Sequence, residues 1–435
     1  MISEQPLADT KQRADWPMAK RIAFRFAFVF WILFDNGLWL VLWVWPWLQR
    51  HVSHWIDAPM EALILWTGRH VFYLSGEAAA RHPTGSGDTA LGWVGAFCAV
   101  VVALTVCVVW SAVSEMRGRR REYNTLYAWL RLVMRFVLAA TLFGYGFLKV
   151  FPLQMPPPSA TTLAEAYGAS SPMKLAWTFL GASWQYRIFA GLSEVIPAAL
   201  LCFRRTSTLG AMGAAAVMLN IFMMNIGYDI PVKLYSLELL LMALFLLLPD
   251  VTPLWRFFVA RKDAALTGVW VRKPERKPLQ IAACVLQGLV IGHILFITGV
   301  SSWKVWHGGE TELKGQWNVQ SPSGAVVDLH WAVMTMRGAY LVQVKIADQD
   351  KPQFLTVAAS PNTRTLEFKQ PDENGAPTGA AYATLHWTDA GPGKLQFAGT
   401  WKDKPAAFTL EKINVPPTLL MSRGFHWVQE YPVNR

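Results

Sequence analysis

Long apolar segments recur along this chain of 435 residues, and they constrain its fold more than any other feature. A helix needs about 20 predominantly apolar residues to cross the hydrocarbon core of a bilayer. We expect a transmembrane helix in each of seven such segments: residues 22–47, 91–113, 132–151, 187–203, 209–227, 232–248 and 280–300. The composition agrees, because only 16% of the residues are charged, against about 25% in soluble domains.

The basic residues are unevenly distributed between the loops, which predicts the orientation. With a cytosolic N-terminus, the segments 1–21, 114–131, 204–205 and 250–279 are cytosolic and carry 4, 5, 2 and 7 lysines and arginines, whereas the opposite loops carry only five. Cytosolic loops are enriched in basic residues. We therefore expect a multi-pass protein of the bacterial inner membrane, with its C-terminus in the periplasm. The bilayer, and no nucleic acid, is then the partner that explains the net charge of +11.

The last third of the chain has a different pattern. From Trp303 onward, short alternating runs are separated by turn signals such as 321–324, 373–375 and 391–393. Such runs are typical of antiparallel strands. We expect strands at 325–333, 339–346, 363–368, 380–387, 395–400 and 407–410, in a small β-barrel or β-sandwich outside the cytoplasm. A periplasmic protein is the partner expected for this domain.

Together these patterns predict an all-α polytopic membrane domain followed by an all-β extracytoplasmic domain. The expected divisions are a cytosolic tail with two helices (1–131), a four-helix bundle (132–249), a basic cytosolic loop with the seventh helix (250–302) and the β domain (303–435).

Ionisable residues in apolar segments are costly, so each suggests a function. On the third expected helix, Tyr145 and Lys149 are four apart and share a face, and Gln154 follows in a proline-rich loop. The fourth helix carries Arg187 and Glu194 seven apart. A desolvated lysine can act as a base, and a cluster of this kind can relay protons beside a lipid-soluble substrate.

Further polar residues lie at the junction of the fifth and sixth expected helices. They are Asn225, Tyr228, Asp229, Lys233 and Glu238. We assign Lys149, Glu194, Lys233 and Asp229 as candidate catalytic residues, and Tyr145, Gln154, Arg187, Asn225, Tyr228 and Glu238 as candidate substrate-binding residues. The alternative, equally supported by residue types, is that these charges pair and only hold the bundle together.

The sequence contains no cofactor signature. All four cysteines lie in apolar runs without a CxxC pair, which argues against a zinc site and a disulfide framework. No dinucleotide-binding or phosphate-binding loop is present in the sequence. We expect no metal, and a bound quinone is the candidate cofactor.

Residues 132–249 resemble the DoxX family of four-helix bacterial membrane proteins. The resemblance rests on Gly146-x-x-Lys149, Phe189-Ala-Gly-Leu-Ser-Glu194, the basic turn 204–206 and the end at Pro249-Asp250. The whole chain is similar to a larger DoxX-like group, through the elements 85–89, 228–234 and 423–432. The resemblance implies a four-helix bundle, and some DoxX relatives are associated with quinol- or thiosulfate-linked redox chemistry.

The third helix also resembles, more distantly, the HTTM membrane domain of vitamin K-dependent gamma-carboxylase. There a helix ends Tyr-x-x-Ala-x-x-Lys-Leu, and its lysine is regarded as the catalytic base. In this chain the tyrosine-to-lysine spacing in 145–149 is shorter, and Val150 replaces the leucine. The resemblance implies a base role for Lys149 and nothing further.

Three functions are therefore compatible with the sequence. The first is an oxidoreductase or carboxylase-like enzyme that acts on a quinone or another lipid-soluble substrate at the outer leaflet. The second is a non-enzymatic scaffold or assembly factor that presents the β domain to a periplasmic partner. The third is a transporter of a small solute.

Overall fold

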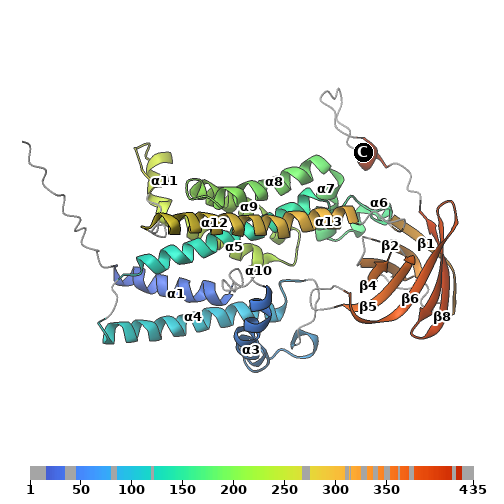
Figure 1. The fold of residues 1–435 in the computed structure, drawn as a ribbon, viewed down its shortest axis with the longest axis horizontal. Helices are drawn as coiled ribbons and strands as arrows, with labels where there is room; N and C mark the ends of the chain where they lie inside the picture. The colour runs from blue at the N-terminus through green and yellow to red at the C-terminus, as the bar shows by residue number, and fades with distance from the viewer. Residues whose placement is uncertain are drawn as a thin grey trace, which may run out of the picture. The chain divides into compact units, whose positions relative to one another are not determined.

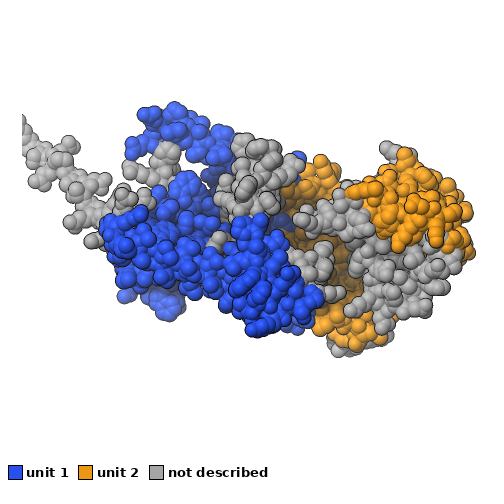
Figure 2. Space-filling model, turned by 90° about the horizontal axis from the view of Figure 1, so that it is seen from below, with its two compact units in different colours: residues 1–144, 193–296 blue, residues 145–192, 297–435 orange. Residues whose placement is uncertain are grey.

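The computed structural model describes residues 16–34, 46–79, 86–118, 122–266, 275–308, 313, 315–324, 331–336, 341–346, 353–360, 363–371, 377–413 and 418–423. The chain forms two compact units. Unit 1 comprises residues 1–144 and 193–296, and unit 2 comprises residues 145–192 and 297–435 (Figure 2).

Unit 1 is helical (Figure 1). It contains α1 (Met18–Phe34), α3 (Pro46–His70), η1 (Gly76–Ala79), α4 (Ala90–Met116), most of α5 (Asn124–Val150), the second half of α8 (Trp184–Leu201), α9 (Ser207–Gly227), α10 (Lys233–Leu247), η3 (Leu248–Asp250), α11 (Val251–Phe258) and α12 (Lys277–Leu295). Helix α1 packs on α4, and α9 packs on α10.

Five helices are long and apolar enough to cross a membrane. They are Ala90–Met116, Asn124–Val150, Ser207–Gly227, Lys233–Phe258 and Lys277–Trp306. Each covers one of the expected spans, which confirms a largely helical region of membrane-length segments. Two expected spans are not among the five. Helix α1 has only 17 residues, with residues 35–45 outside the described part, and α8 has 18 residues that include buried Arg187 and Glu194.

Small residues let the helices of unit 1 approach one another closely. A Cβ on Gly210 of α9 would lie 2.7 Å from the backbone nitrogen of Leu201, and a Cβ on Gly213 would lie 3.0 Å from the Pro197 ring. In a bilayer there is little hydrophobic free energy to gain when one apolar helix packs on another, because the lipid is equally apolar. Membrane helices therefore associate through such close contacts. The α8–α9 hairpin is therefore held by direct backbone packing.

The helical part of unit 2 is short. It contains the last turn of α5, α6 (Ala160–Ala164), η2 (Tyr167–Ala169), α7 (Pro172–Ala182) and the start of α8. A π-helical turn, Phe296–Val300, follows α12 and leads into α13 (Ser301–Gly308). One further short helix, α14 (Leu419–Ser422), follows the strands.

Eight antiparallel strands form a closed barrel in unit 2. They are β1 (Gly315–Gly324), β2 (Trp331–Met336), β3 (Leu341–Ile346), β4 (Gln353–Ser360), β5 (Thr365–Pro371), β6 (Pro377–Gly391), β7 (Lys394–Trp401) and β8 (Lys404–Lys412). Each strand pairs with the next, and β1 closes the barrel against β8, with Trp317 opposite Lys412. The expected β domain is thus confirmed, as a barrel rather than a sandwich.

Alternation of side chains fills the barrel. Along β7, Leu395, Phe397 and Trp401 are buried, and Phe397 stacks on Phe408 of β8 with ring centroids 5.1 Å apart. Trp387, Phe368 and Leu385 belong to the same core. An eight-stranded barrel has an interior that side chains of this size can fill.

Two strands, β1 and β4, were not expected from the sequence. The segment 321–324 was expected to be a turn, and this prediction is wrong, because it lies at the end of β1 opposite β8. The register shifts between Gln320 and Ser323, and Ser321 and Gly324 have positive φ angles of 50° and 67°. A β-bulge therefore uses the residues that resemble a turn. The expected strand residues 325–330 and the turn 373–375 lie outside the described residues.

Candidate functional site

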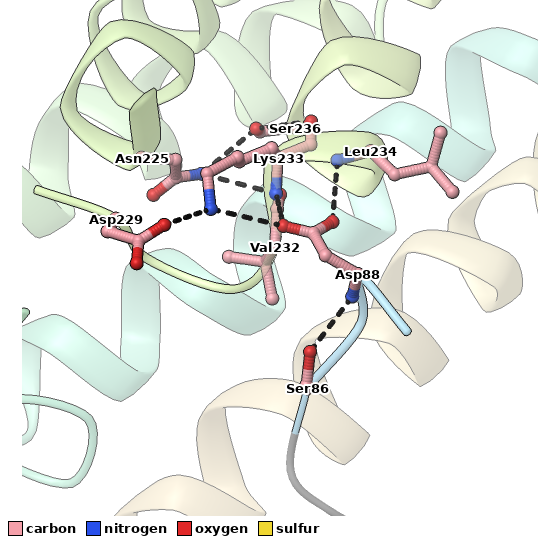
Figure 3. Close-up of polar contacts among 8 residues, drawn as sticks. All are labelled: Ser86, Asp88, Asn225, Asp229, Val232, Lys233, Leu234 and Ser236. Carbon is pink, nitrogen blue, oxygen red and sulfur yellow. Dashed lines mark hydrogen bonds and ion pairs between the residues drawn. The ribbon is translucent and has the colours of Figure 1, made fainter. Parts of the chain in front are cut away.

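The candidate residues fall into two groups, one in each unit. The first group, here called the Asp88 anchor, consists of Ser86, Asp88, Asn225, Asp229, Lys233 and Ser236 in unit 1 (Figure 3). It begins where the loop before α4 meets the start of α10. The Asp88 carboxylate accepts hydrogen bonds from the backbone nitrogens of Lys233, at 2.8 Å, and Leu234, at 2.9 Å. These are the donors that every helix N-terminus leaves without an intrahelical partner.

The neighbouring residues of the loop reinforce this contact. The Ser86 hydroxyl accepts from the Asp88 backbone nitrogen at 3.1 Å, and the Gly87 nitrogen donates to the Pro231 carbonyl at 2.8 Å. Thr89, next along the chain, caps α4 through a bond from the Gly92 nitrogen. Adjacent residues thus cap two different helices, and the N-termini of α4 and α10 are tied to one another.

Lys233 lies between two carboxylates. Its ammonium group is 2.8 Å from Asp229 and 3.7 Å from Asp88. The Asp229 side chain is 84% exposed, and its backbone has a φ of 49°, where the chain turns between α9 and α10. Asn225 donates to the Ser236 hydroxyl at 2.9 Å and to the Val232 carbonyl at 3.4 Å. The structure therefore brings Asn225, Asp229 and Lys233 together, in a group whose charges are paired.

The second group is here called the Arg187 region, and it consists of Tyr145, Lys149, Gln154 and Arg187 in unit 2. Lys149 lies in the last turn of α5 and is only 6% exposed, with its ammonium group 5.7 Å from the centre of the Tyr145 ring. The chain then turns, and the nitrogens of Leu153 and Gln154 both donate to the Leu148 carbonyl. This closure ends α5 and places Gln154 directly after it.

A helix–helix contact brings α8 to the same place. A Cβ on Gly191 would lie 2.7 Å from the Gly146 carbonyl oxygen and 2.9 Å from the backbone nitrogen of Val150. The α8 backbone thus touches the last turn of α5 where only glycine fits. Lys149 immediately precedes Val150, and Arg187 is one helical turn before Gly191. The backbone of Lys149 and that of Arg187 therefore both lie next to the contact between α5 and α8.

Two polar side chains of the Arg187 region have buried atoms without a partner. Arg187 is 6% exposed, and its Nε and Nη1 atoms make no hydrogen bond to any described residue. The Oε1 atom of Gln154 is likewise buried without a donor among the described residues. Native structures leave few such groups unsatisfied, and each costs about 1–3 kcal/mol. Arg187 therefore offers donors, and Gln154 an acceptor, that the described part of the chain does not use.

Two other buried arginines of the bundle make hydrogen bonds within unit 1. Arg25 is buried and donates to the Tyr123 hydroxyl, at 2.9 Å and 3.1 Å, and to the Ser111 hydroxyl, at 2.7 Å. Arg131 donates to the carbonyls of Phe245 and Leu246, at 3.5 Å and 2.8 Å, at the end of α10. These two arginines have structural partners for part of their guanidinium group. The described residues provide no such acceptor for the Nε and Nη1 atoms of Arg187.

The remaining candidates lie elsewhere in unit 1. Glu194 and Glu238 are buried on α8 and α10, and Tyr228 is exposed at the end of α9. Three residues of the anchor, Ser86, Asp88 and Ser236, are not among the candidates that the sequence indicates. The signal for Asp88 is the loop 85–89, which does not indicate that its aspartate caps a helix 145 residues further on. Among the described residues, no group of three or more His, Cys, Asp or Glu is placed to hold a metal ion.

Comparison with known proteins gives one informative similarity. No family model matches the chain. No solved structure matches it either. A protein of Bacillus subtilis (strain 168), described as uncharacterized protein YwoB, is 38% identical over 116 residues. These residues are 27% of this chain and 73% of YwoB. The similarity covers most of the relative at a high identity, and the chain therefore belongs to the family of YwoB.

Proposed function

We propose that this protein binds a lipid-soluble molecule at the Arg187 region and acts on it, and that the molecule is a quinone or quinol. The observation that carries the proposal is the buried guanidinium of Arg187, because no described residue accepts a hydrogen bond from its Nε or Nη1 atom. An arginine at membrane depth faces the protein interior or a cavity and requires an acceptor. A ligand oxygen would supply it.

The chemistry of a quinol suits the two orphaned groups. A quinone carbonyl accepts hydrogen bonds from a guanidinium, and a quinol hydroxyl can donate to the Oε1 atom of Gln154. The isoprenoid tail of such a molecule remains in lipid. The DoxX resemblance supports the same substrate class, because some DoxX relatives are associated with quinol-linked redox chemistry.

In this proposal Lys149 is the base, as the HTTM resemblance implies, and takes the proton of a substrate hydroxyl. Oxidation of a quinol releases two protons and two electrons, and a second quinone or a redox protein accepts the electrons. Tyr145, whose ring lies beside the Lys149 ammonium group, limits the access of water to it. We assign Asp229, Lys233 and Asn225 to the Asp88 anchor, where they position helices rather than contact substrate.

Mass spectrometry of small molecules extracted from the protein, purified in a mild detergent, tests the proposal. We expect about one quinone or quinol per chain, lost in Arg187→Gln and partly retained in Arg187→Lys. Arg205→Gln removes the same charge from an exposed position and is the matched control. Recovery of bulk phospholipid alone from the unaltered protein, or equal quinone in Arg187→Gln, would contradict it.

We also infer that the chain crosses the membrane seven times, with a cytosolic N-terminus and a periplasmic barrel. Two contacts support this count. Asp88 bonds the start of α10, so both lie at one membrane surface, and α4, α5 and α9 between them need a fourth crossing, α8. Arg21 pairs with Glu115 at 2.9 Å, which supports one further crossing between them besides α4, and we assign that crossing to α1.

A second candidate function is a scaffold whose barrel binds a periplasmic protein. The observation that favours it is the aromatic core, because a barrel filled by Phe397, Phe408 and Trp387 presents its outer surface rather than a lumen. The two functions can be separated by complementation of a strain that lacks the protein with a chain truncated after residue 308. A scaffold fails without the barrel even when the truncated protein retains its bound quinone.

A further inference from the structure

Helix α11 is the last part of the membrane-length helical segment Lys233–Phe258, after α10 and η3, and it has an apolar face that the described protein does not cover. Val251, Trp255 and Phe258 recur at helical spacing and share this face, and Phe257 extends it. The exposed fractions of Trp255, Phe257 and Phe258 are 62%, 60% and 61%. Thr252 and Arg256 lie on the other side of the helix.

The position of α11 along the chain places it at a membrane surface. Residues 233–250 number eighteen and span about 27 Å as a helix, close to the thickness of the hydrocarbon core. Pro249, in the 3-10 turn η3, and Pro253, in the first turn of α11, both lack a backbone donor. The helix direction changes here, and α11 turns across the line of α9 and α12 (Figure 1).

The joint between α10 and α11 is fixed. Asp250 is 1% exposed and accepts a hydrogen bond from the Thr208 hydroxyl of α9 at 2.8 Å. Arg131 donates to the Leu246 carbonyl at the end of α10, at 2.8 Å. The direction in which α11 leaves the bundle is therefore set by buried contacts.

Basic residues gather where α11 ends. Arg256, Arg261 and Lys262 are all exposed. Arg261 has a φ of 52°, and the Lys262 nitrogen donates to the Arg256 carbonyl at 2.9 Å. This hydrogen bond brings the backbone of the three basic residues together at the C-terminal end of α11. The sequence 250–279 contains seven lysines and arginines against three acidic residues, so the charge of the segment is strongly positive.

We propose that α11 is an interfacial anchor that binds the headgroup region of an anionic phospholipid membrane. Trp255, Phe257 and Phe258 insert at the boundary between headgroups and acyl chains, while Arg256, Arg261 and Lys262 contact lipid phosphates. An apolar face with aromatic residues beside a basic face is the composition of helices that lie in the plane of a membrane. The complementary charge of anionic lipids selects this occupant over a neutral surface.

The first test measures lipid preference with the full chain in nanodiscs that contain mixtures of phosphatidylglycerol and phosphatidylcholine. The variant Arg256→Gln/Arg261→Gln/Lys262→Gln should reduce the enrichment of phosphatidylglycerol around the protein by about ten-fold or more. The matched control, Lys394→Gln/Lys402→Gln/Lys404→Gln, removes the same charge from exposed barrel positions and should leave the enrichment unchanged. Equal enrichment in both variants would overturn the proposal.

The second test measures depth, and it does not depend on the charge variants. Phe257→Cys and Thr252→Cys, each in a chain whose native cysteines are replaced, carry an environment-sensitive fluorophore on opposite faces of α11. We expect lipid-borne quenchers to reach the label at 257 and aqueous quenchers to reach the label at 252. Equal aqueous quenching at both positions, or a label at 257 shielded from both quenchers by another protein, contradicts an anchor in lipid.

Discussion

A single carboxylate, that of Asp88, connects two parts of unit 1 that are far apart in sequence. It accepts from two backbone nitrogens at the start of α10 and lies 3.7 Å from the Lys233 ammonium group. A side-chain cap of this kind usually comes from the residue that precedes the helix. Here Val232 occupies that position and cannot cap, so the distant aspartate takes its place.

Asp88→Ala should therefore lower the thermal stability of unit 1. Loss of a capping carboxylate costs about 1–2 kcal/mol. Asp88→Asn keeps an acceptor oxygen and should retain part of that stability. The melting temperature in mild detergent measures both. Asp229→Asn is the matched control, because it removes only the charge of the exposed partner of Lys233, tolerates the φ of 49° and should leave the melting temperature nearly unchanged. Equal melting of Asp88→Ala and Asp229→Asn would contradict the capping role.

We expect Tyr382 of β6 to make the stability of the barrel depend on alkaline pH. Burial raises the pKa of its hydroxyl above the ordinary value of 10.0, and the ring meets Trp401 edge-on at 5.6 Å. A raised pKa in the folded state means that Tyr382 stabilises the barrel fully below the unfolded pKa. This stability is lost as the pH rises through the folded pKa.

Urea unfolding followed by tryptophan fluorescence between about pH 9 and about pH 11 tests this pH dependence. The unaltered protein should lose stability over that range, and Tyr382→Phe should lose less. Tyr167→Phe, at an exposed position outside the barrel, should behave like the unaltered protein. Identical slopes for Tyr382→Phe and the unaltered protein would exclude Tyr382 as the source.

Between helices, the contact of α8 with α5 depends on Gly191. Because Gly191 has no side chain, the Gly146 carbonyl oxygen can lie close to it, at a point only 2.7 Å from where a Cβ of residue 191 would be. Gly191→Ala should therefore separate the two helices at a cost of about 1–3 kcal/mol, and displace Arg187 one turn away. Gly288→Ala on α12 is the control, because no atom lies within 4 Å of its Cβ and alanine favours a helix. Melting temperatures of the two variants should move in opposite directions.

The helices and strands show what sequence patterns can and cannot predict. Apolar length alone located the five helices that meet the criteria for membrane spans, because that signal is local. The strand β4 was missed, since its alternation is weak, and β1 was missed because Ser321-Pro-Ser-Gly324 has the composition of a turn. A bulge uses the same residues as a turn, and only pairing with β8 distinguishes the two.

The candidate site was predictable in part. Buried polar residues in an apolar segment stand out in sequence, and Lys149, Glu194 and Arg187 are indeed buried. Their grouping was not predictable. The sequence placed Lys233 and Asp229 with Lys149, whereas their observed partners are Asp88 and each other, because a contact across 145 residues leaves no periodic signal. The catalytic roles of these residues stay predictions.

For the chain as a whole, the proposal of seven membrane crossings rests on parity. Residues joined by a short hydrogen bond at a membrane surface must be separated by an even number of crossings. Asp88 and Lys233 are so joined, and α4, α5 and α9 are three of the membrane-length helices between them. In the proposed topology, helix α8 is the fourth crossing, although it carries Arg187 and Glu194. Buried polar residues in a spanning helix are tolerated where they face protein rather than lipid.

Labelling of single cysteines with a membrane-impermeant maleimide tests this topology in intact cells. Lys174→Cys precedes α8 and should be labelled from the periplasm, whereas Arg205→Cys follows it and should be labelled only after the membrane is opened. Lys402→Cys in the barrel should react like Lys174→Cys, since an odd number of crossings puts the barrel opposite the N-terminus. If the cysteines at 174 and 205 react from the same side, α8 does not cross. The contact between Asp88 and α10 would then be incompatible with α4, α5 and α9 all spanning the bilayer.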